Sequence, residues 1–166
     1  MWFSRGFFGF DYDGAVREAI HAFKFNGSKS IGRQLVRLIS DKFHDLGNDV
    51  DCIVPVPVSG KRLRERGFNQ SYIIAEEIAD ITGLTIDHAA LTKREGTRDQ
   101  FSLSRSERKK NIRGAFGVKN SHSLKGRRIL LVDDLFTTGY TASEAARTLI
   151  EAGSADVVLF ALARTP

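Results

Sequence analysis

Two adjacent carboxylates followed by a cluster of small hydroxyl residues are the part of this sequence best suited to chemistry. Asp133 and Asp134 come directly after an apolar run at 129–132. The chain then continues through Thr137, Thr138, Gly139, Tyr140 and Thr141. Backbone N–H groups in such a loop can hold a phosphate, especially where a helix begins, and carboxylates accept hydrogen bonds from ribose hydroxyls. The segment therefore indicates a binding site for a sugar phosphate.

A strand and a helix must hold this loop in place. The run 129–132 is typical of a strand that is buried on both faces of a parallel sheet. Thr141 and Glu144 form the pattern of a capping box, so we expect a helix to begin there and to continue through Leu149. A capped strand–turn–helix without any ligand is the plainer alternative, because a pair of acids after a strand is often only a solvated strand end.

A second segment is strongly basic and also follows a strand. Residues 52–58 form a short apolar run, and its two prolines prevent a central strand from continuing beyond that point. The loop expected at 59–66 opens with Ser-Gly and carries four cations and one acid. Arginine forks match the oxygens of pyrophosphate, so we expect this loop to bind a pyrophosphate group. A solvated, charged surface is the alternative.

The remaining periodicities predict an α/β fold. Helices are expected at 13–25, 30–43 and 70–82, and short strands at 84–86, 89–91, 115–118 and 157–163. Strands that alternate with helices from about residue 50 onward indicate a mostly parallel central sheet flanked by helices. In such sheets ligands bind at the carboxyl ends of the strands. The segments 59–66 and 133–141 each follow the carboxyl end of an expected strand. We therefore expect them to form one site.

Composition sets broad limits on the kind of protein. The chain has 166 residues, and we expect a single domain, 1–166, that needs no disulfide to build its core. The net charge of +5 suits phosphorylated ligands or nucleic acid without selecting either. The single cysteine, Cys52, excludes an intramolecular disulfide and an all-cysteine metal site in this chain. No stretch approaches the ~20 apolar residues that span a bilayer, so we expect a cytoplasmic protein without membrane insertion.

The segment from Leu130 to Thr141 resembles the ribose-phosphate binding loop of the type I phosphoribosyltransferases. That motif has an apolar strand, two acids, two or three variable residues, Thr-Gly, one further residue and then Thr or Ser, and the match here has no gap. The resemblance implies the type I phosphoribosyltransferase fold with a small hood. We place that hood at the aromatic residues 1–12, which can alternatively be the cut edge of a longer protein.

The resemblance also implies roles for individual residues. Asp133 and Asp134 would be catalytic and would hold the ribose hydroxyls, while residues 137–141 would hold the phosphate of the ribose. The pyrophosphate would be bound by Ser59, Gly60, Lys61 and Arg62. A flexible loop at 93–113 would close over the site, and its candidates to reach phosphate are Arg94, Arg105 and Arg108. The ligand would be phosphoribosyl pyrophosphate or a nucleotide, with Mg²⁺ bound mainly to the ligand's own oxygens.

Three further stretches resemble the ComF family of competence proteins. They are Pro-Val-Pro at 55–57, Arg-Glu-Arg-Gly-Phe-Asn-Gln at 64–70, and the stretch from 100 to 116. This resemblance implies a role in DNA uptake and natural transformation, with single-stranded DNA and other competence proteins as partners. ComF proteins commonly carry a four-cysteine zinc segment ahead of this domain. Those cysteines are missing here, so we expect no zinc site in these residues.

The sequence leaves three functions open. The first is transfer of the phosphoribosyl group to an acceptor, and the second is a module that binds ribose phosphate without turnover. The third is binding of single-stranded DNA through the basic runs 61–66 and 105–113, which would depend strongly on salt. No residue names the acceptor base. Its recognition is expected from residues 1–12 together with Arg164.

Overall fold

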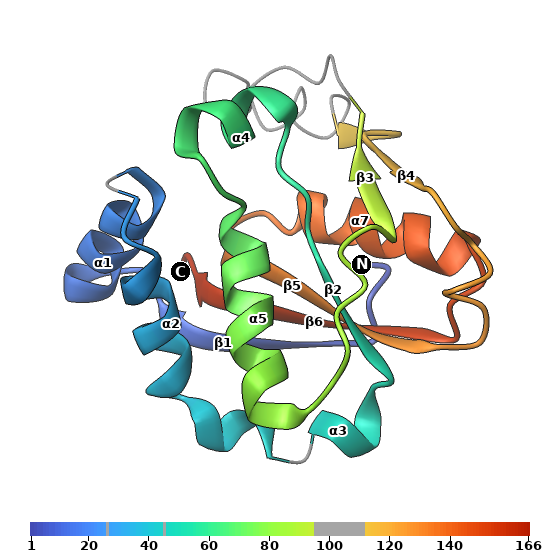
Figure 1. Ribbon diagram of the computed structural model, residues 1–166, viewed down its shortest axis with the longest axis horizontal. Helices are drawn as coiled ribbons and strands as arrows, with labels where there is room; N and C mark the ends of the chain where they lie inside the picture. Colours follow the sequence, from blue (N-terminus) through green and yellow to red (C-terminus); the bar gives the residue numbers. More distant parts are fainter. Residues whose placement is uncertain (26, 45, 95–111) are drawn as a thin grey trace.

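A computed structural model describes residues 1–25, 27–44, 46–94 and 112–166, and these build an α/β structure. Its centre is a sheet of four parallel strands in the order β1-β6-β5-β2. The strands are β1 (Arg5–Asp11), β2 (Cys52–Pro55), β5 (Arg128–Phe136) and β6 (Asp156–Arg164). The central parallel sheet expected from the sequence is therefore confirmed (Figure 1).

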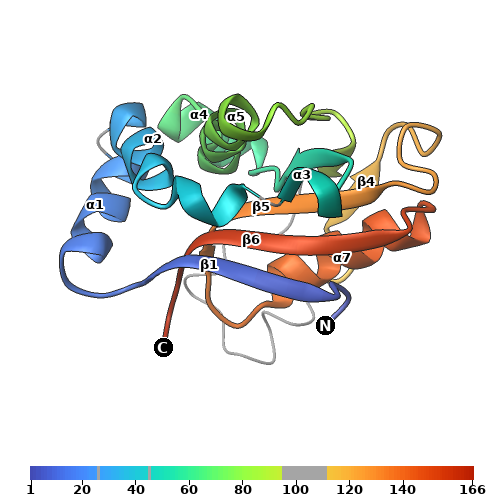
Figure 2. The same ribbon diagram turned by 90° about the horizontal axis from the view of Figure 1, so that it is seen from below.

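Helices cover both faces of this sheet, as Figure 2 shows. On one face lie α1 (Gly14–Phe25), α2 (Lys29–Arg37) and α5 (Gln70–Thr82), and on the other lies α7 (Tyr140–Glu151). Shorter helices are η1 (Ser40–Phe43), α3 (Leu46–Asp49) and α4 (Gly60–Arg66). An antiparallel pair, β3 (Leu91–Lys93) and β4 (Phe116–Val118), forms a second small sheet. The described helices are all too short or too polar to cross a membrane.

The middle of the large sheet is buried on both faces. Along β5, Leu130 and Val132 pack into the core beneath α1, α2 and α5, whereas Ile129 and Leu131 pack into the core beneath α7. All four side chains have no exposed surface. This is the arrangement that a continuous apolar run predicts, because each face of the strand needs apolar side chains.

The stretch expected to form a hood contributes a strand to the large sheet. Strand β1 pairs in parallel with β6, so that Phe7 lies opposite Phe160 and Phe10 opposite Ala163. Phe10 packs against the core under α5, and Phe8 packs against the core under α7. The parallel pairing with β6 makes this stretch a strand, and its aromatic residues Phe8 and Phe10 serve core packing. Residues 5–11 of the stretch expected to form a hood are therefore an edge strand of the large sheet.

The helices expected at 13–25 and 70–82 and the strands expected at 115–118 and 157–163 lie within one or two residues of their observed bounds, whereas other elements differ more. The helix expected at 30–43 ends at Arg37 and is followed by the turn η1, because Ser40 and Asp41 favour caps and turns over helix interiors. The strands expected at 84–86 and 89–91 are also shorter. Ile86 makes a single parallel bridge to Ile53, and a strand begins only at Leu91.

Candidate functional site

The two segments singled out by their chemistry leave adjacent strands at the same edge of the sheet. Strands β2 and β5 are neighbours, with Pro55 opposite Val132. The pairing extends one residue further, because the Val56 N–H donates to the Val132 carbonyl at 2.9 Å. The segments 59–66 and 133–141 therefore begin side by side at the carboxyl ends of two parallel strands, where ligands bind in such folds.

The basic segment is a helix and not the expected loop. Ser59 is the N-cap of α4, and its hydroxyl accepts a hydrogen bond from the Arg62 N–H at 3.3 Å. Gly67 ends the helix in the left-handed region at φ +77°. Lys, Arg, Leu and Glu are all good helix formers, and together with these caps they make a short helix that local interactions stabilise. Ser59, Gly60, Lys61 and Arg62 thus form its cap and first turn.

The acidic pair lies within a strand that is longer than expected. Strand β5 continues to Phe136, and Asp133 is paired with Ala161 in the register of β5 and β6. One carboxylate oxygen of Asp133, Oδ1, accepts the Ser71 hydroxyl at 3.2 Å and the Asp134 N–H at 2.9 Å. Ser71 belongs to the first turn of α5, so this helix holds the first acid in place.

The second acid is held by a cation from a distant helix. Lys24, in the last turn of α1, forms an ion pair with Asp134 at 3.0 Å between Nζ and Oδ2. Each of the two side chains is only 15% exposed, so the pair is largely removed from water. Lys24 and Ser71 are the functional neighbours that sequence patterns did not find. Neither is near the acids in the sequence, and neither belongs to a motif that would mark it.

Burial makes Asp133 a weak acid. Desolvation raises its pKa to about 7, and the neighbouring charge of Asp134 acts in the same direction. The hydrogen bond from the Asp134 N–H, the charge of Lys24 and the Ser71 hydroxyl oppose this shift only in part. Asp133 therefore changes charge near neutral pH.

The acidic pair fits a Mg²⁺ ion that arrives with its ligand. Within the described residues, no hydrogen bond or ion pair uses Oδ2 of Asp133 or Oδ1 of Asp134, so each acid keeps one oxygen for a ligand. Carboxylate oxygens are the hard donors that Mg²⁺ prefers. The described part of the chain contains no group of three or more metal-binding side chains. The remaining oxygens would therefore have to come from the ligand and from water.

The hydroxyl-rich loop ends at the start of α7, but not through the expected capping box. Gly139, at φ +75°, is the N-cap, and no side chain caps the helix. Glu144 is 8% exposed and instead accepts the Gly114 N–H at 2.6 Å, with Arg147 beside it. The capping assignment for Thr141 and Glu144 was wrong, because a tertiary contact occupies the Glu144 carboxylate. Residues 137–141 nevertheless lie where the first N–H groups of a helix lack helical partners.

The beginning of the chain packs against this loop. The Trp2 N–H donates to the Ser143 hydroxyl of α7 at 3.3 Å. The Phe136 ring contacts the rings of Phe3 and Phe8, with centroids 6.4 and 5.0 Å apart. Arg164, expected to help recognise a base, pairs with Asp11 at 3.1 Å at the ends of β6 and β1. Residues near the beginning of the chain therefore pack against the end of β5 and the start of α7, on either side of the loop.

The expected flexible loop is only partly within the described residues. Arg94 follows β3, and its N–H donates to the Ala115 carbonyl at 2.8 Å, which continues the pairing of β3 and β4. The stretch 95–111, with Arg105 and Arg108, lies outside the described residues. The small sheet thus brings the described residues that flank that stretch, Arg94 and Ala115, next to each other.

Comparison with known proteins relates this chain to one family of proteins. The phosphoribosyl transferase domain family matches residues 27–166. The DNA utilization protein YhgH of Salmonella typhimurium is 32% identical over 160 residues, which cover 93% of this chain and 70% of that protein. Competence protein ComFC of Bacillus subtilis is 33% identical over 161 residues, covering 94% of this chain and 62% of that protein. The chain therefore corresponds to roughly two thirds of the length of these relatives.

Solved structures share the fold at lower identity. The purine phosphoribosyltransferase from Pyrococcus horikoshii is 17% identical with a TM-score of 0.50, covering 82% of this chain and 74% of that one. The glutamine phosphoribosylpyrophosphate amidotransferase from Bacillus subtilis is 20% identical with a TM-score of 0.50, covering 81% of this chain and 26% of that one. These likenesses concern the fold alone.

Proposed function

Because the chain belongs to the phosphoribosyl transferase domain family, and within it to the ComF competence proteins, we propose that it binds phosphoribosyl pyrophosphate. The observation that carries this proposal is the parallel pairing of β2 and β5. It sets the acidic and hydroxyl-rich segment beside the basic segment, so that both ends of one elongated, highly charged ligand meet matching groups.

Each part of the ligand has a group of residues suited to it. The loop at 137–141 and the start of α7 receive the phosphate of the ribose, since N–H groups and the helix dipole favour an anion. Asp133 and Asp134 accept hydrogen bonds from the ribose hydroxyls through the oxygens that other residues leave open. The pyrophosphate lies against Ser59, Gly60, Lys61 and Arg62.

The same arrangement suits transfer of the phosphoribosyl group to an acceptor. Departure of pyrophosphate leaves positive charge on the ribose, and the two carboxylates would stabilise that charge. Mg²⁺, when bound, would neutralise the departing pyrophosphate. The first turn of α4 would hold the pyrophosphate in position, and the loop at 137–141 would hold the opposite end of the ribose.

The relatives suggest a cellular context. Their names refer to DNA utilization and to competence. We therefore place the proposed binding activity in the handling of incoming DNA in the cytoplasm. The net charge of +5 and the cations of α4 agree with a partner that carries phosphates.

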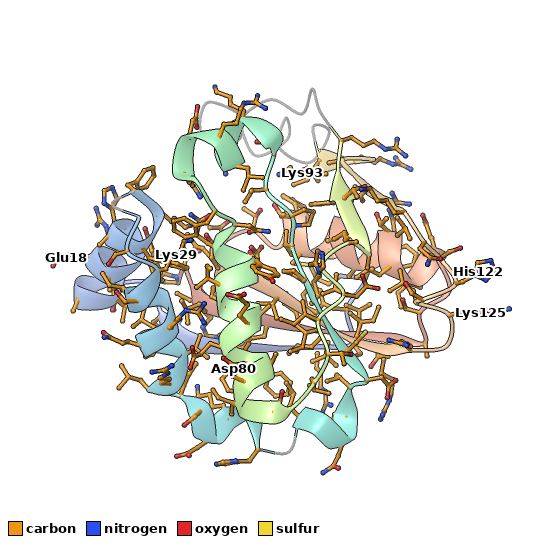
Figure 3. All side chains as sticks on the ribbon, in the orientation of Figure 1. Glu18, Lys29, Asp80, Lys93, His122 and Lys125 are labelled. Carbon is orange, nitrogen blue, oxygen red and sulfur yellow. The ribbon has the colours of Figure 1, made fainter. Side chains whose placement is uncertain are left out.

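Calorimetric titration with phosphoribosyl pyrophosphate, with and without Mg²⁺, tests the binding proposal. Asp134→Asn is expected to weaken binding by roughly tenfold to a hundredfold, because charged hydrogen bonds to the ribose become weaker. Asp80→Asn is the matched control, since Asp80 is exposed near the other end of α5 (Figure 3). No binding by the unaltered protein, or equal effects of the two variants, would contradict the proposal.

Release of pyrophosphate, measured against a panel of nucleobases, tests transfer separately. Release with one base identifies the acceptor. Binding without release from any base makes the chain a ribose-phosphate module that does not turn its ligand over. Binding of labelled single-stranded DNA that persists in Asp134→Asn and falls steeply with salt would instead favour a nucleic-acid site on the basic segment.

A further inference from the structure

A second cavity lies outside the proposed ribose-phosphate site. It has a volume of about 590 Å³, which is within the range of small-molecule pockets. Helices α2, α4 and α5 and the end of β2 surround it, on the side of the molecule nearest the viewer in Figure 1. Its walls combine apolar and aromatic side chains with a few charged ones, chiefly Leu63, Phe68, Tyr72, Lys29, Arg33 and His88.

The cavity and the acidic pair use different sides of α5. Ser71 donates to Asp133, whereas the next residue, Tyr72, lines the cavity. Consecutive residues of a helix point about 100° apart, so the two ligands would not share this turn of α5. The start of α5 is tied to the chain after β2, because the Asn69 side-chain N–H donates to the Val56 carbonyl at 3.1 Å. This hydrogen bond lies between the cavity and the acidic pair.

One part of the cavity is suited to a flat ring. Leu63 lines it from α4 and is 46% exposed, so its side chain is open to a ligand. Tyr72 lines it from α5, and the His88 ring stands nearly perpendicular to the Tyr72 ring at 6.1 Å. Pro57 completes this apolar part. Aromatic and aliphatic walls of this kind hold planar rings by stacking and burial.

Another part of the cavity offers a positive charge. The Lys29 ammonium lies 5.3 Å from the centre of the Phe68 ring. Among the ion pairs within the described residues, none joins Lys29 to a carboxylate. Arg33 differs, because it is paired with Glu76 at 2.7 Å and with Glu77 at 3.4 Å. Lys29 is thus the cation of this cavity whose charge an incoming anion can balance.

We propose that this cavity is a second binding site, for a flat aromatic ring that carries an anionic group, and that a nucleoside 5′-monophosphate is the matching class of ligand. The base lies between Leu63 and Tyr72, and the phosphate lies at Lys29. The cavity shares α4 with the proposed phosphoribosyl site, since Leu63 directly follows Arg62, but its described lining residues are not those assigned to phosphoribosyl pyrophosphate. Phosphoribosyl pyrophosphate, which has no ring of this kind, is not its ligand.

Calorimetric titration with AMP in the presence of excess ribose 5-phosphate and pyrophosphate tests the proposal, because these two ligands occupy the loop at 137–141 and the first turn of α4 and leave the cavity open. Tyr72→Leu removes the ring with little change in volume, and it should weaken AMP binding roughly fivefold to a hundredfold. Lys29→Met should weaken AMP but leave adenosine, which lacks the anion, unchanged. Lys125→Met, at the far end of the molecule in Figure 3, should change neither.

Absence of AMP binding under these conditions would overturn the proposal, as would binding that Tyr72→Leu and Lys29→Met leave unchanged. Thermal unfolding of each variant shows whether it is folded. Asp134→Asn separates this result from the ribose-phosphate proposal, since it should weaken ribose 5-phosphate and leave AMP binding at the cavity intact. If the unaltered protein does not bind ribose 5-phosphate, the ribose-phosphate proposal is contradicted and the proposal for the cavity is not.

Discussion

The two halves of the proposed phosphoribosyl site are stabilised in different ways. The acidic half, 133–141, depends on residues from far along the chain, since Ser71 binds Asp133 and Lys24 binds Asp134. The basic half, 59–66, is a short helix with local caps, and its Arg66 also lies 5.2 Å from the centre of the Phe25 ring of α1. Its N-cap is Ser59, and Lys61 and Glu65 lie 3.9 Å apart as an i,i+4 pair.

The difference shows which half of the site is held in place by tertiary contacts and which by local ones. Buried carboxylates need partners, because an unpaired charge away from water is costly. The acidic half is therefore fixed by tertiary contacts that exist only in the folded protein. The cations of α4 lie nearer to solvent, where a charge costs less, so a short capped helix is enough to present them. Substitutions in the acidic half should consequently have larger effects on the free energy of unfolding.

Gly139→Ala should have the largest effect. Gly139 has φ +75°, and a Cβ there would lie 2.8 Å from a ring atom of Phe136, a ring that the neighbouring Phe8 ring supports. We expect the free energy of unfolding to fall by about 2–4 kcal/mol, from backbone strain together with overpacking. Gly126→Ala is the control, because φ is +72° there but no atom lies within 4 Å of the added Cβ. Equal losses in urea unfolding would show that the loop is not tightly packed.

Lys24→Met should have the next largest effect. The substitution leaves the Asp134 charge without its cation beside Asp133, at a position that is only 15% exposed. We expect a loss of about 1–3 kcal/mol in the free energy of unfolding at pH 8. Lys125→Met removes an exposed lysine and should change stability very little. A loss no greater than that of the control would mean that the acidic half does not depend on α1.

Asp133→Asn should stabilise the protein at high pH. The pKa of Asp133 is about 7 in the folded protein, against an ordinary value of 3.8, so ionisation costs stability as pH rises. The penalty is absent below about pH 4, grows as pH rises through 7, and then levels off. Asparagine stays neutral, so we expect the variant to gain stability relative to the unaltered protein as pH rises from 4.5 to 8. Urea unfolding at pH 4.5 and pH 8 checks this, and a pH-independent difference would contradict it.

Ser59→Ala should have the smallest effect. It removes the side-chain acceptor of the Arg62 N–H, and the expected loss is about 0.5–1 kcal/mol. Ser28→Ala is a matched control, because Ser28 is the N-cap of α2 but makes no capping hydrogen bond with its side chain. Amide hydrogen exchange in α4 should increase in the first variant and stay constant in the second. A loss as large as that of Lys24→Met would remove the distinction between the two halves.

The sequence alone determined the features that depend on neighbours within about ten residues. The apolar run before Asp133 predicted a strand buried on both faces, and the pattern at 70–82 predicted α5 with the bounds that the structure shows. The alternation of strands and helices predicted the parallel sheet, and with it the shared edge of the two segments. Periodicity and turn residues are local signals, so they can be read before any tertiary contact is known.

The tertiary structure decided what those local signals could not contain. In the folded protein, Ser71 and Lys24 contact the acidic pair. Glu144 binds the Gly114 N–H and does not cap its helix, and residues 5–11 pair with β6. Each depends on the path that brings distant segments together, and on the cost of leaving a buried polar group without a partner. The chemistry of the acidic pair, including its raised pKa, therefore belongs to the fold and not to the motif.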